Sequence, residues 1–410
     1  MPTPSLLIVP ARFKTGRLYS QLPTSGGDFT VTRATAATRV NASGLIESVA
    51  SGIPRLDYFA SGGTVGCPAL LVEPSGSNLA LQSENFGTTW SPTNITITTG
   101  STAAFTAPDG TTNADLLTST SSISASSLTQ TITVASGTSS ISVFAKAGNY
   151  GLFRIGNVSS LARAAWFNLD AGAVTGTVNG GSASMQNYGN GWYRCTFTPT
   201  TTVSGSDAFI IGISNAPNGT LGVSGSSIYF WGAQLETGSI ATSYIPTTTA
   251  AVTRNADVVS VSGAVSGSIG QQSGTIYIEC QSEFATNDII VINTAGQSPG
   301  NNYVSITKTA TNVFRLSLIA SGTTILIDQT SAITSFAKIA VAYASGNTAL
   351  FINGTQIGST NTTGFSFNAA LNNISFISNM VSGTKTTRIR ALALYTTRLS
   401  NAELAALTTP

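Results

Sequence analysis

The stretch WGAQLETGSIATSYIPTTTAAVTRNAD, residues 231–257, decides how this chain is organised. It continues from Ser227–Phe230, whose aromatic and β-branched side chains are typical of a strand. Pro246 has a fixed φ and no N–H to donate, so it ends or borders a strand. Alternation of apolar and polar residues begins again at Val258–Val261. The stretch predicts two β-domains joined in series by a short tether, which favours a modular binding or structural protein over a compact enzyme.

The composition predicts folded domains with few charges. The chain has 410 residues, enough for two or three domains, and 41% of them are hydrophobic. Charged residues make up only 8%, against roughly 25% in an average soluble domain. Ser, Thr, Gly and Asn take the polar positions, as suits exposed strands and tight turns. Disorder is not favoured, because it requires low hydrophobicity together with a high net charge.

Charge and hydropathy exclude two classes of partner. The net charge is +2 and no basic block stands out, so nucleic-acid binding is not expected. No apolar run approaches the roughly 20 residues of a membrane-spanning helix, so membrane insertion is not expected either. The opening MPTPSLLIVP has no basic segment before its short apolar patch. We therefore expect synthesis in a cytosol without export by a signal peptide.

Cysteine and histidine usage limits the chemistry. Cys67, Cys195 and Cys280 are far apart and odd in number, so they predict buried, reduced thiols instead of disulfides or a metal site. The chain contains 0 histidines, which removes the usual general base and the commonest zinc ligand. Catalysis would have to use the 16 Asp and Glu residues, Lys or Tyr.

The fold class predicted from strand and turn signals is all-β, with antiparallel sandwiches and a short C-terminal helix. Residues 1–85 read as an extended leader with little core of its own. Residues 86–246 and 255–410 read as two sandwiches, and residues 247–254 as the tether. Asn353-Gly354 predicts a type I′ hairpin. Ser400 and Glu403 form a capping-box pattern that opens the helix.

Several phrases carry a family resemblance. FAKAG (144–148), NGWYRCTF (190–197) and WGAQLETGSIATSYIPTT (231–248) together resemble a carbohydrate-binding-module-like jelly roll found in bacteriophage tail and fibre proteins. FTVTRATAATRVNASGLIESV, IPRLDY and LLVEPSGSNLALQSENF resemble the leader that precedes it. LFINGTQIGS and ALALYTTRLSNAELAAL are similar to a concanavalin-like, laminin-G-type lectin sandwich.

The resemblance implies a non-enzymatic virion protein, in a fibre, spike or tail, that displays glycan- or receptor-binding modules for host attachment. It implies other virion proteins, a host surface glycan or receptor, and copies of the same chain as partners, with a homotrimer favoured. Two alternatives stay open. One is a purely architectural capsid or tail decoration protein without glycan binding. The other is a polysaccharide depolymerase, which the absent histidines and sparse carboxylates disfavour.

Candidate catalytic and metal residues are few. Glu279 and Glu283 flank Gln281 on one predicted strand, but positions i and i+4 lie roughly 13 Å apart. Glycosidase pairs need roughly 5–9.5 Å, so no catalytic residue is assigned. No cofactor is expected. A structural calcium ion stays open on Asp109, Asp115, Asp257 and Asp288, although no acidic loop supplies the six to eight oxygens it needs.

Aromatic residues are the candidate glycan-binding positions. Tyr150, Phe153, Trp166 and Tyr188 could present ring faces to sugar C–H groups, with core packing as the favoured alternative. Trp192 and Trp231 are expected in a core. The phrase Val-Thr-Arg recurs in leader and tether, so Arg33 and Arg254 either anchor these segments to the sandwiches or are solvated.

Overall fold

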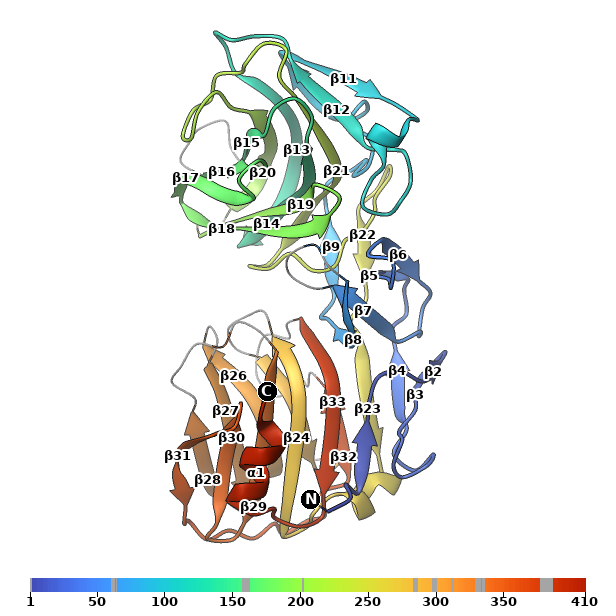
Figure 1. Ribbon diagram of the computed structural model, residues 1–410, viewed down its shortest axis with the longest axis vertical. Helices are drawn as coiled ribbons and strands as arrows, with labels where there is room; N and C mark the ends of the chain where they lie inside the picture. Colours follow the sequence, from blue (N-terminus) through green and yellow to red (C-terminus); the bar gives the residue numbers. More distant parts are fainter. Residues whose placement is uncertain are drawn as a thin grey trace.

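The computed structural model describes residues 2–59, 63, 65–156, 163–200, 203–282, 287–296, 301–310, 313–328, 333, 336–376 and 386–410. Two β-sandwiches are stacked along the long axis of the molecule, and both chain termini lie in the lower one (Figure 1). Within the described residues the structure contains 33 strands, two short 3-10 helices and one α-helix. The predicted all-β class, with antiparallel sandwiches and a short C-terminal helix, is confirmed.

The upper lobe, here called the inserted sandwich, consists of two six-stranded antiparallel sheets. The first, the β13 sheet, has the order β10 (Ser91–Thr93), β13 (Ser126–Gly137), β20 (Val203–Ile213), β15 (Leu152–Gly156), β16 (Ala164–Asn168) and β17 (Ala173–Asn179). The second, the β14 sheet, has the order β11 (Ile95–Thr99), β12 (Asp115–Ser119), β21 (Ser227–Thr237), β14 (Ser139–Ala147), β19 (Trp192–Pro199) and β18 (Gly181–Gly189).

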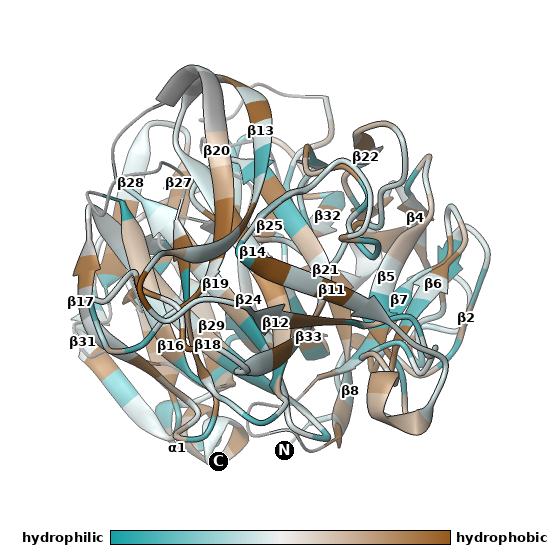
Figure 2. Cartoon of the chain, turned by 90° about the horizontal axis from the view of Figure 1, so that it is seen from above, coloured by the Kyte–Doolittle hydropathy of each residue, from teal (hydrophilic) through white to brown (hydrophobic). Residues whose placement is uncertain are grey.

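Aromatic rings fill the space between these two sheets. Phe153 packs against Phe167 and Phe230, with ring centroids 5.4 and 5.1 Å apart. Apolar and polar residues alternate along strands such as β13, which places every second side chain in the core (Figure 2). The inserted sandwich therefore has a hydrophobic core of its own.

The lower lobe, here called the composite sandwich, consists of an eight-stranded and a nine-stranded sheet. The eight-stranded β24 sheet has the order β31 (Thr355–Asn361), β30 (Thr348–Ile352), β29 (Ala337–Ala344), β24 (Ser273–Ser282), β33 (Thr387–Tyr395), β8 (Val65–Val72) and β7 (Arg55–Phe59), with β1 (Leu6–Ile8) also on β33. The nine-stranded β26 sheet has the order β2 (Phe13–Lys14), β3 (Arg17–Leu18), β4 (Phe29–Thr32), β23 (Val258–Ser262), β32 (Asn373–Phe376), β25 (Asn287–Asn293), β26 (Asn302–Ala310), β27 (Val313–Ala320) and β28 (Thr323–Asp328).

The leader contributes strands to both sheets of the composite sandwich, which corrects the expectation of an extended segment with little core. In β4, Phe29 and Val31 are buried while Thr30 and Thr32 are exposed. Leu6 and Val72 lie in the same core as strands from the far end of the chain, because β1 and β8 both pair with β33. The predicted boundary at residue 85 therefore does not separate the leader from this sandwich.

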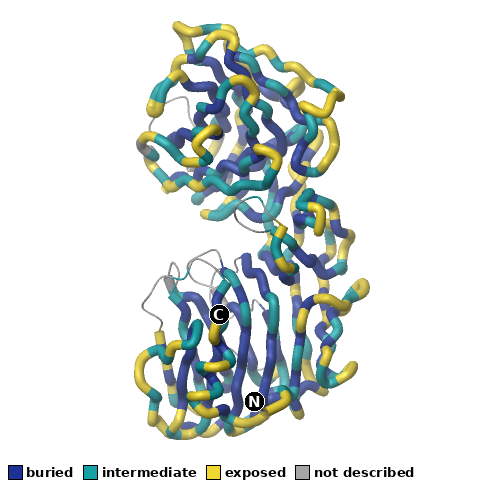
Figure 3. Tube along the Cα trace, in the orientation of Figure 1, coloured by how far each residue is buried: buried dark blue, intermediate teal, exposed yellow. Residues whose placement is uncertain are grey.

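Two chain segments connect the lobes side by side. β9 (Gly76–Asn78) enters the upper lobe and pairs antiparallel with β22 (Val252–Arg254), which leaves it. The upper lobe is thus inserted between β8 and β23 of the composite sandwich. The leader hairpin of β5 (Ala37–Val40) and β6 (Ile46–Val49) lies beside this connection (Figure 1). Figure 3 shows buried strands in both lobes and exposed residues concentrated in turns and loops.

Local signals read from the sequence are realised at the C-terminal end. Asn353 and Gly354 have φ of 49° and 82°, as the predicted I′ hairpin between β30 and β31 requires. Ser400 caps α1 (Asn401–Thr408), and Glu403 completes the capping box. Tyr277, Phe351 and Leu404 belong to one buried cluster between this helix and the β24 sheet. The 3-10 helices cover Ala103–Phe105 and Ala264–Ser268.

The three cysteines are free, and two of them are buried as predicted. Burial raises the pKa of Cys195 and raises that of Cys280 to about 12. Cys67 departs from the prediction, because it is exposed on the outward side of β8.

Candidate functional site

The four candidate aromatic residues do not share one surface. Phe153 and Trp166 are both 0% exposed, so neither can present a ring face to a sugar. Phe153 belongs to the core, and the Trp166 indole N–H donates to the Gly219 carbonyl at 2.9 Å. Tyr150 is half-buried and donates to the Ser214 carbonyl at 3.0 Å. Core packing, the alternative, therefore describes Phe153, whereas Trp166 is buried on the opposite face of the β13 sheet.

Tyr188 lies on the other sheet, at the contact between the inserted sandwich and the leader. Its ring packs against Phe59 and Phe144, with centroids 4.8 and 4.9 Å apart. Trp192 and Trp231 belong to the same cluster and are 2% and 1% exposed, as predicted for buried residues. This aromatic patch on the outer face of the β14 sheet is thus a docking surface within the chain.

A wide polar groove lies beside the connection between the lobes. This junction groove has a volume of about 840 Å³. Ten of its fourteen lining residues carry a hydroxyl, amide or carboxyl group, and they come from the 82–85, 99–101, 112–115 and 246–252 segments. Such a lining offers many hydrogen bonds and few charges. Polar residues of the lining include Glu84, Asn85, Thr112, Asn113, Asp115 and Thr248.

Two carboxyl groups of the junction groove are held in place by hydrogen bonds. Asn113 donates to Glu84 at 3.0 Å, and Tyr244 donates to the other oxygen of Glu84 at 2.9 Å. The Phe86 backbone N–H donates to Asp115 at 2.7 Å. Burial raises the pKa of Glu84, and burial raises that of Asp115 to about 6. Among the described residues neither carboxyl group forms an ion pair; Glu84 is half-buried, and Asp115 is only 2% exposed.

Asp115→Asn is expected to change the pH dependence of stability. Because the folded-state pKa of Asp115 is about 6, against an ordinary value of 3.8, the unfolded chain loses its proton first as the pH rises. Ionising this carboxyl therefore lowers stability between about pH 4 and pH 6, by up to about 3 kcal/mol. The difference in unfolding free energy between the variant and the wild type should therefore shift in favour of the variant by that amount from pH 4 to pH 8. Urea unfolding at both pH values tests this, and a constant difference would contradict it.

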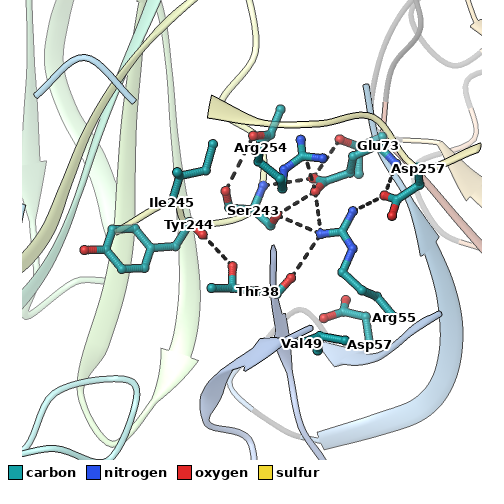
Figure 4. Close-up of polar contacts among 12 residues, drawn as sticks. Thr38, Val49, Arg55, Asp57, Glu73, Ser243, Tyr244, Ile245, Arg254 and Asp257 are labelled. Atoms are coloured by element: carbon teal, nitrogen blue, oxygen red, sulfur yellow. Dashed lines mark hydrogen bonds and ion pairs between the residues drawn. The ribbon is translucent and has the colours of Figure 1, made fainter. Parts of the chain in front are cut away.

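A buried polar network joins the two lobes (Figure 4). Arg55 in β7 is 1% exposed and donates to Glu73 at 2.8 Å, to Ser243 at 2.8 Å and to Asp257. Ser243 in turn donates to Glu73 through its N–H at 2.8 Å and its hydroxyl at 2.6 Å. Thr38 in the leader hairpin donates to the Tyr244 carbonyl. Leader, both connecting segments and the end of the inserted sandwich thus meet at one guanidinium.

Electrostatics in this network favour the ionised forms of its acids. Burial by itself would raise the pKa of Glu73, but Arg55 and Arg254 outweigh burial and hold that pKa well below its usual range. Burial would likewise lower the pKa of Arg55, yet Asp257 and Glu73 raise it above its usual range. Seven charged side chains in and beside this junction are buried: Arg33, Arg55, Asp57, Glu73, Arg254, Asp257 and Arg388.

The two Val-Thr-Arg phrases both end in anchoring arginines, one of the two alternatives left by the sequence. Arg33 is 3% exposed and donates to Asp257 at 2.8 Å and to the Ala50 carbonyl at 2.7 Å. Arg254 is 1% exposed and donates to the Pro74 carbonyl at 2.6 Å. Neither arginine is solvated, and each fixes a segment between the lobes.

Among the described residues, no group of three or more His, Cys, Asp and Glu side chains is placed to hold a metal ion. Asp257 is taken by two arginines, Asp109 bonds Thr111 within its own loop, and the side chain of Asp288 is not among those described. Glu279 lies 3.5 Å from Arg390, and Glu283 falls outside the described residues. In the described part of the chain, no helix is both long and apolar enough to span a membrane.

The junction groove was not predicted from the sequence, because the candidate glycan-binding residues were chosen among aromatic side chains and the groove is lined mainly by small polar ones. The sequence offers Asp115 only as a candidate calcium ligand. The other signals are short polar phrases, Ser83–Asn85 and Thr111–Asn113, each beside a turn. No feature of the neighbouring sequence predicts that these two phrases and the tether lie side by side.

No protein-family model and no curated protein matches this chain. Among solved structures it is similar to the CBM40 of Ruminococcus gnavus IT-sialidase, with 18% identity, a TM-score of 0.32 and coverage of 37% of this chain and 92% of that one. It is similar to the botulinum neurotoxin type G receptor-binding domain, with 13% identity, a TM-score of 0.29 and coverage of 37% and 39%. It is also similar to the SAP-like pentraxin of Limulus polyphemus, with 11% identity, a TM-score of 0.27 and coverage of 36% and 69%.

Proposed function

We propose that this chain is a non-enzymatic structural protein of a bacteriophage virion, in a fibre, spike or tail, that binds host-surface glycans. The junction groove is the observation that carries the binding part of the proposal. Its volume of about 840 Å³ lies within the range of roughly 300–1,000 Å³ typical of small-molecule sites. Its hydroxyl, amide and carboxyl groups match the alternating donors and acceptors of sugar hydroxyls.

The virion part of the proposal rests on the phrases that resemble phage proteins. Synthesis in the host cytoplasm, assembly with other virion proteins and a homotrimer belong to it. Copies held together would make weak single-site binding strong, because each further contact becomes intramolecular. Electron microscopy of virions labelled with antibody against this chain tests the location, and unlabelled particles would contradict it.

A blocking variant tests glycan binding in the junction groove. Thr248 lines the groove with an exposed side chain, so Thr248→Trp should fill it and weaken binding by about tenfold or more, the effect of losing roughly 1.4 kcal/mol. Thr96→Trp, at an exposed position of β11 outside the groove, is the matched control and should bind like wild type. The measurement is a glycan array of bacterial surface polysaccharides, followed by affinities for the glycans that bind.

The second candidate is a purely architectural role, and the junction network favours it. A buried network of ion pairs that ties two lobes together suits a rigid building block. In that case the array shows no binding to any host polysaccharide, and Thr248→Trp behaves like Thr96→Trp in every assay. Binding that Thr248→Trp removes would exclude it.

A further inference from the structure

A second groove lies on the outer face of the β14 sheet. It has a volume of about 270 Å³, and the residues Ser239, Ile240 and Ala241 that follow β21 contribute to its lining. Alternate residues of two neighbouring strands form its floor, while the residues between them face the core. The floor residues are Ser182, Ser184 and Gln186 of β18 and Arg194, Thr196 and Thr198 of β19. Five of the six are neutral hydrogen-bonding side chains, so the groove contains a single charge.

No carboxylate of the described residues forms an ion pair with that charge. Arg194 is 5% exposed, and its guanidinium lies 5.5 Å from the Phe144 ring centroid. In the described part of the chain its one hydrogen bond joins Nη2 to the Ser142 hydroxyl at 3.1 Å, and it forms no ion pair within 4 Å. Its Nε has no acceptor there. Enclosing an unpaired cation is costly, so the position is suited to receive an anion.

Arg194 acts electrostatically on the carboxyl of Glu236, and that carboxyl already accepts hydrogen bonds from other groups. Glu236 accepts from the Thr242 backbone N–H at 2.7 Å, from the Thr242 hydroxyl at 2.7 Å and from Gln234 at 2.6 Å. Burial raises the pKa of Glu236, with Thr242 and Arg194 opposing that shift. Glu236 therefore organises the loop over the groove and does not pair with the guanidinium.

We propose that this groove binds a carboxylate-bearing sugar residue, with Arg194 receiving the carboxylate. A guanidinium presents paired N–H donors that match the two oxygens of a carboxylate. The Ser, Thr and Gln side chains on the floor supply partners for ring hydroxyls. This inference rests on the proposed function only in that the ligand is a glycan. It uses a different groove, so the two can fail separately.

Calorimetry with the full chain tests the inference. The probes are a uronic-acid-containing oligosaccharide, its carboxyl-reduced neutral counterpart and a sulfated neutral oligosaccharide. We expect the uronic acid ligand to bind about tenfold or more tightly than its reduced counterpart, the effect of a charge-assisted hydrogen bond. Arg194→Gln should remove that preference, and Arg194→Lys should keep only part of it. Arg315→Gln, which removes an exposed charge in the other lobe, is the control.

Ser184→Trp covers the case in which Arg194 variants fail to fold. Ser184 is exposed on the groove floor, so a tryptophan there should block the acidic ligand without touching the guanidinium. Equal affinity for the acidic and reduced ligands, or tightest binding of the sulfated one, would overturn the inference. So would unchanged binding in Ser184→Trp. The two proposals are distinguished by their outcomes. If Thr248→Trp loses neutral-glycan binding while the wild type shows no preference for the acidic ligand, the junction groove is supported and the Arg194 inference is refuted.

Discussion

Arg55→Ala is expected to lower the free energy of unfolding by about 3–5 kcal/mol, because it leaves Glu73 and Asp257 buried without their partner. This decrease in the free energy of unfolding should exceed the decrease caused by removing one partner of any exposed ion pair described in this chain. Arg55 contacts the leader, the first connecting segment, the end of the inserted sandwich and the second connecting segment. Its removal should therefore loosen the lobes from each other as well as destabilise the fold.

Denaturation by urea measures this effect. All four tryptophans, Trp90, Trp166, Trp192 and Trp231, lie in the inserted sandwich, so their fluorescence reports on that lobe. Arg315→Ala is the control, since its ion pair with Asp328 is 31% and 40% exposed and should contribute less than about 1 kcal/mol. Similar midpoint shifts in the two variants would contradict a structural role for the network.

Asn78→Ala is the second variant with a large expected effect. Asn78 is 0% exposed and uses all four hydrogen-bonding positions of its amide. It donates to the carbonyls of Ala233 and Ile245 at 3.0 and 2.8 Å. It accepts from the N–H groups of Ala80 and Leu235, both at 3.0 Å. Truncation leaves four buried backbone groups unsatisfied, so we expect a loss of about 4 kcal/mol or more.

Two further variants separate the contribution of Asn78 from a general effect of asparagine removal. Asn78→Asp keeps the accepting positions but sets a buried carboxylate against the Ala233 and Ile245 carbonyls, so it should be at least as destabilising as Asn78→Ala. Asn85→Ala, at an exposed position whose side chain accepts only from Gly87 among the described contacts, should cost less than about 1 kcal/mol. Thermal unfolding of the set would contradict the prediction if Asn78→Ala and Asn85→Ala melted alike.

The sequence was sufficient for features that depend on near neighbours. Alternation and turn residues predicted antiparallel sandwiches, the Asn353-Gly354 hairpin and the cap at Ser400. It was not sufficient for the leader, because Leu6 pairs with Leu394 and nothing local to either residue encodes that distance. The leader phrases that resemble phage proteins contain Arg33, Arg55, Glu73 and Asn78, so much of that pattern corresponds to buried polar contacts.

The candidate site was harder to predict than the fold. Alternation within β16 places Trp166 and Phe167 on opposite faces of the β13 sheet, but it does not show that both faces are covered. Trp166 is enclosed because the 215–219 segment folds over the outer face, where its indole bonds Gly219. The junction groove and the Arg194 groove are assembled from polar residues distant in sequence. Composition and spacing carry no signal for such an arrangement.

The glycan-binding claim is tested most directly by a crystal structure of the full chain with the tightest-binding neutral glycan from the array. A sugar in the junction groove, with hydroxyl groups within hydrogen-bond distance of Thr112 and Asn113, is the predicted result. A sugar bound elsewhere on the chain, or an empty groove at a concentration well above the measured Kd, would contradict it.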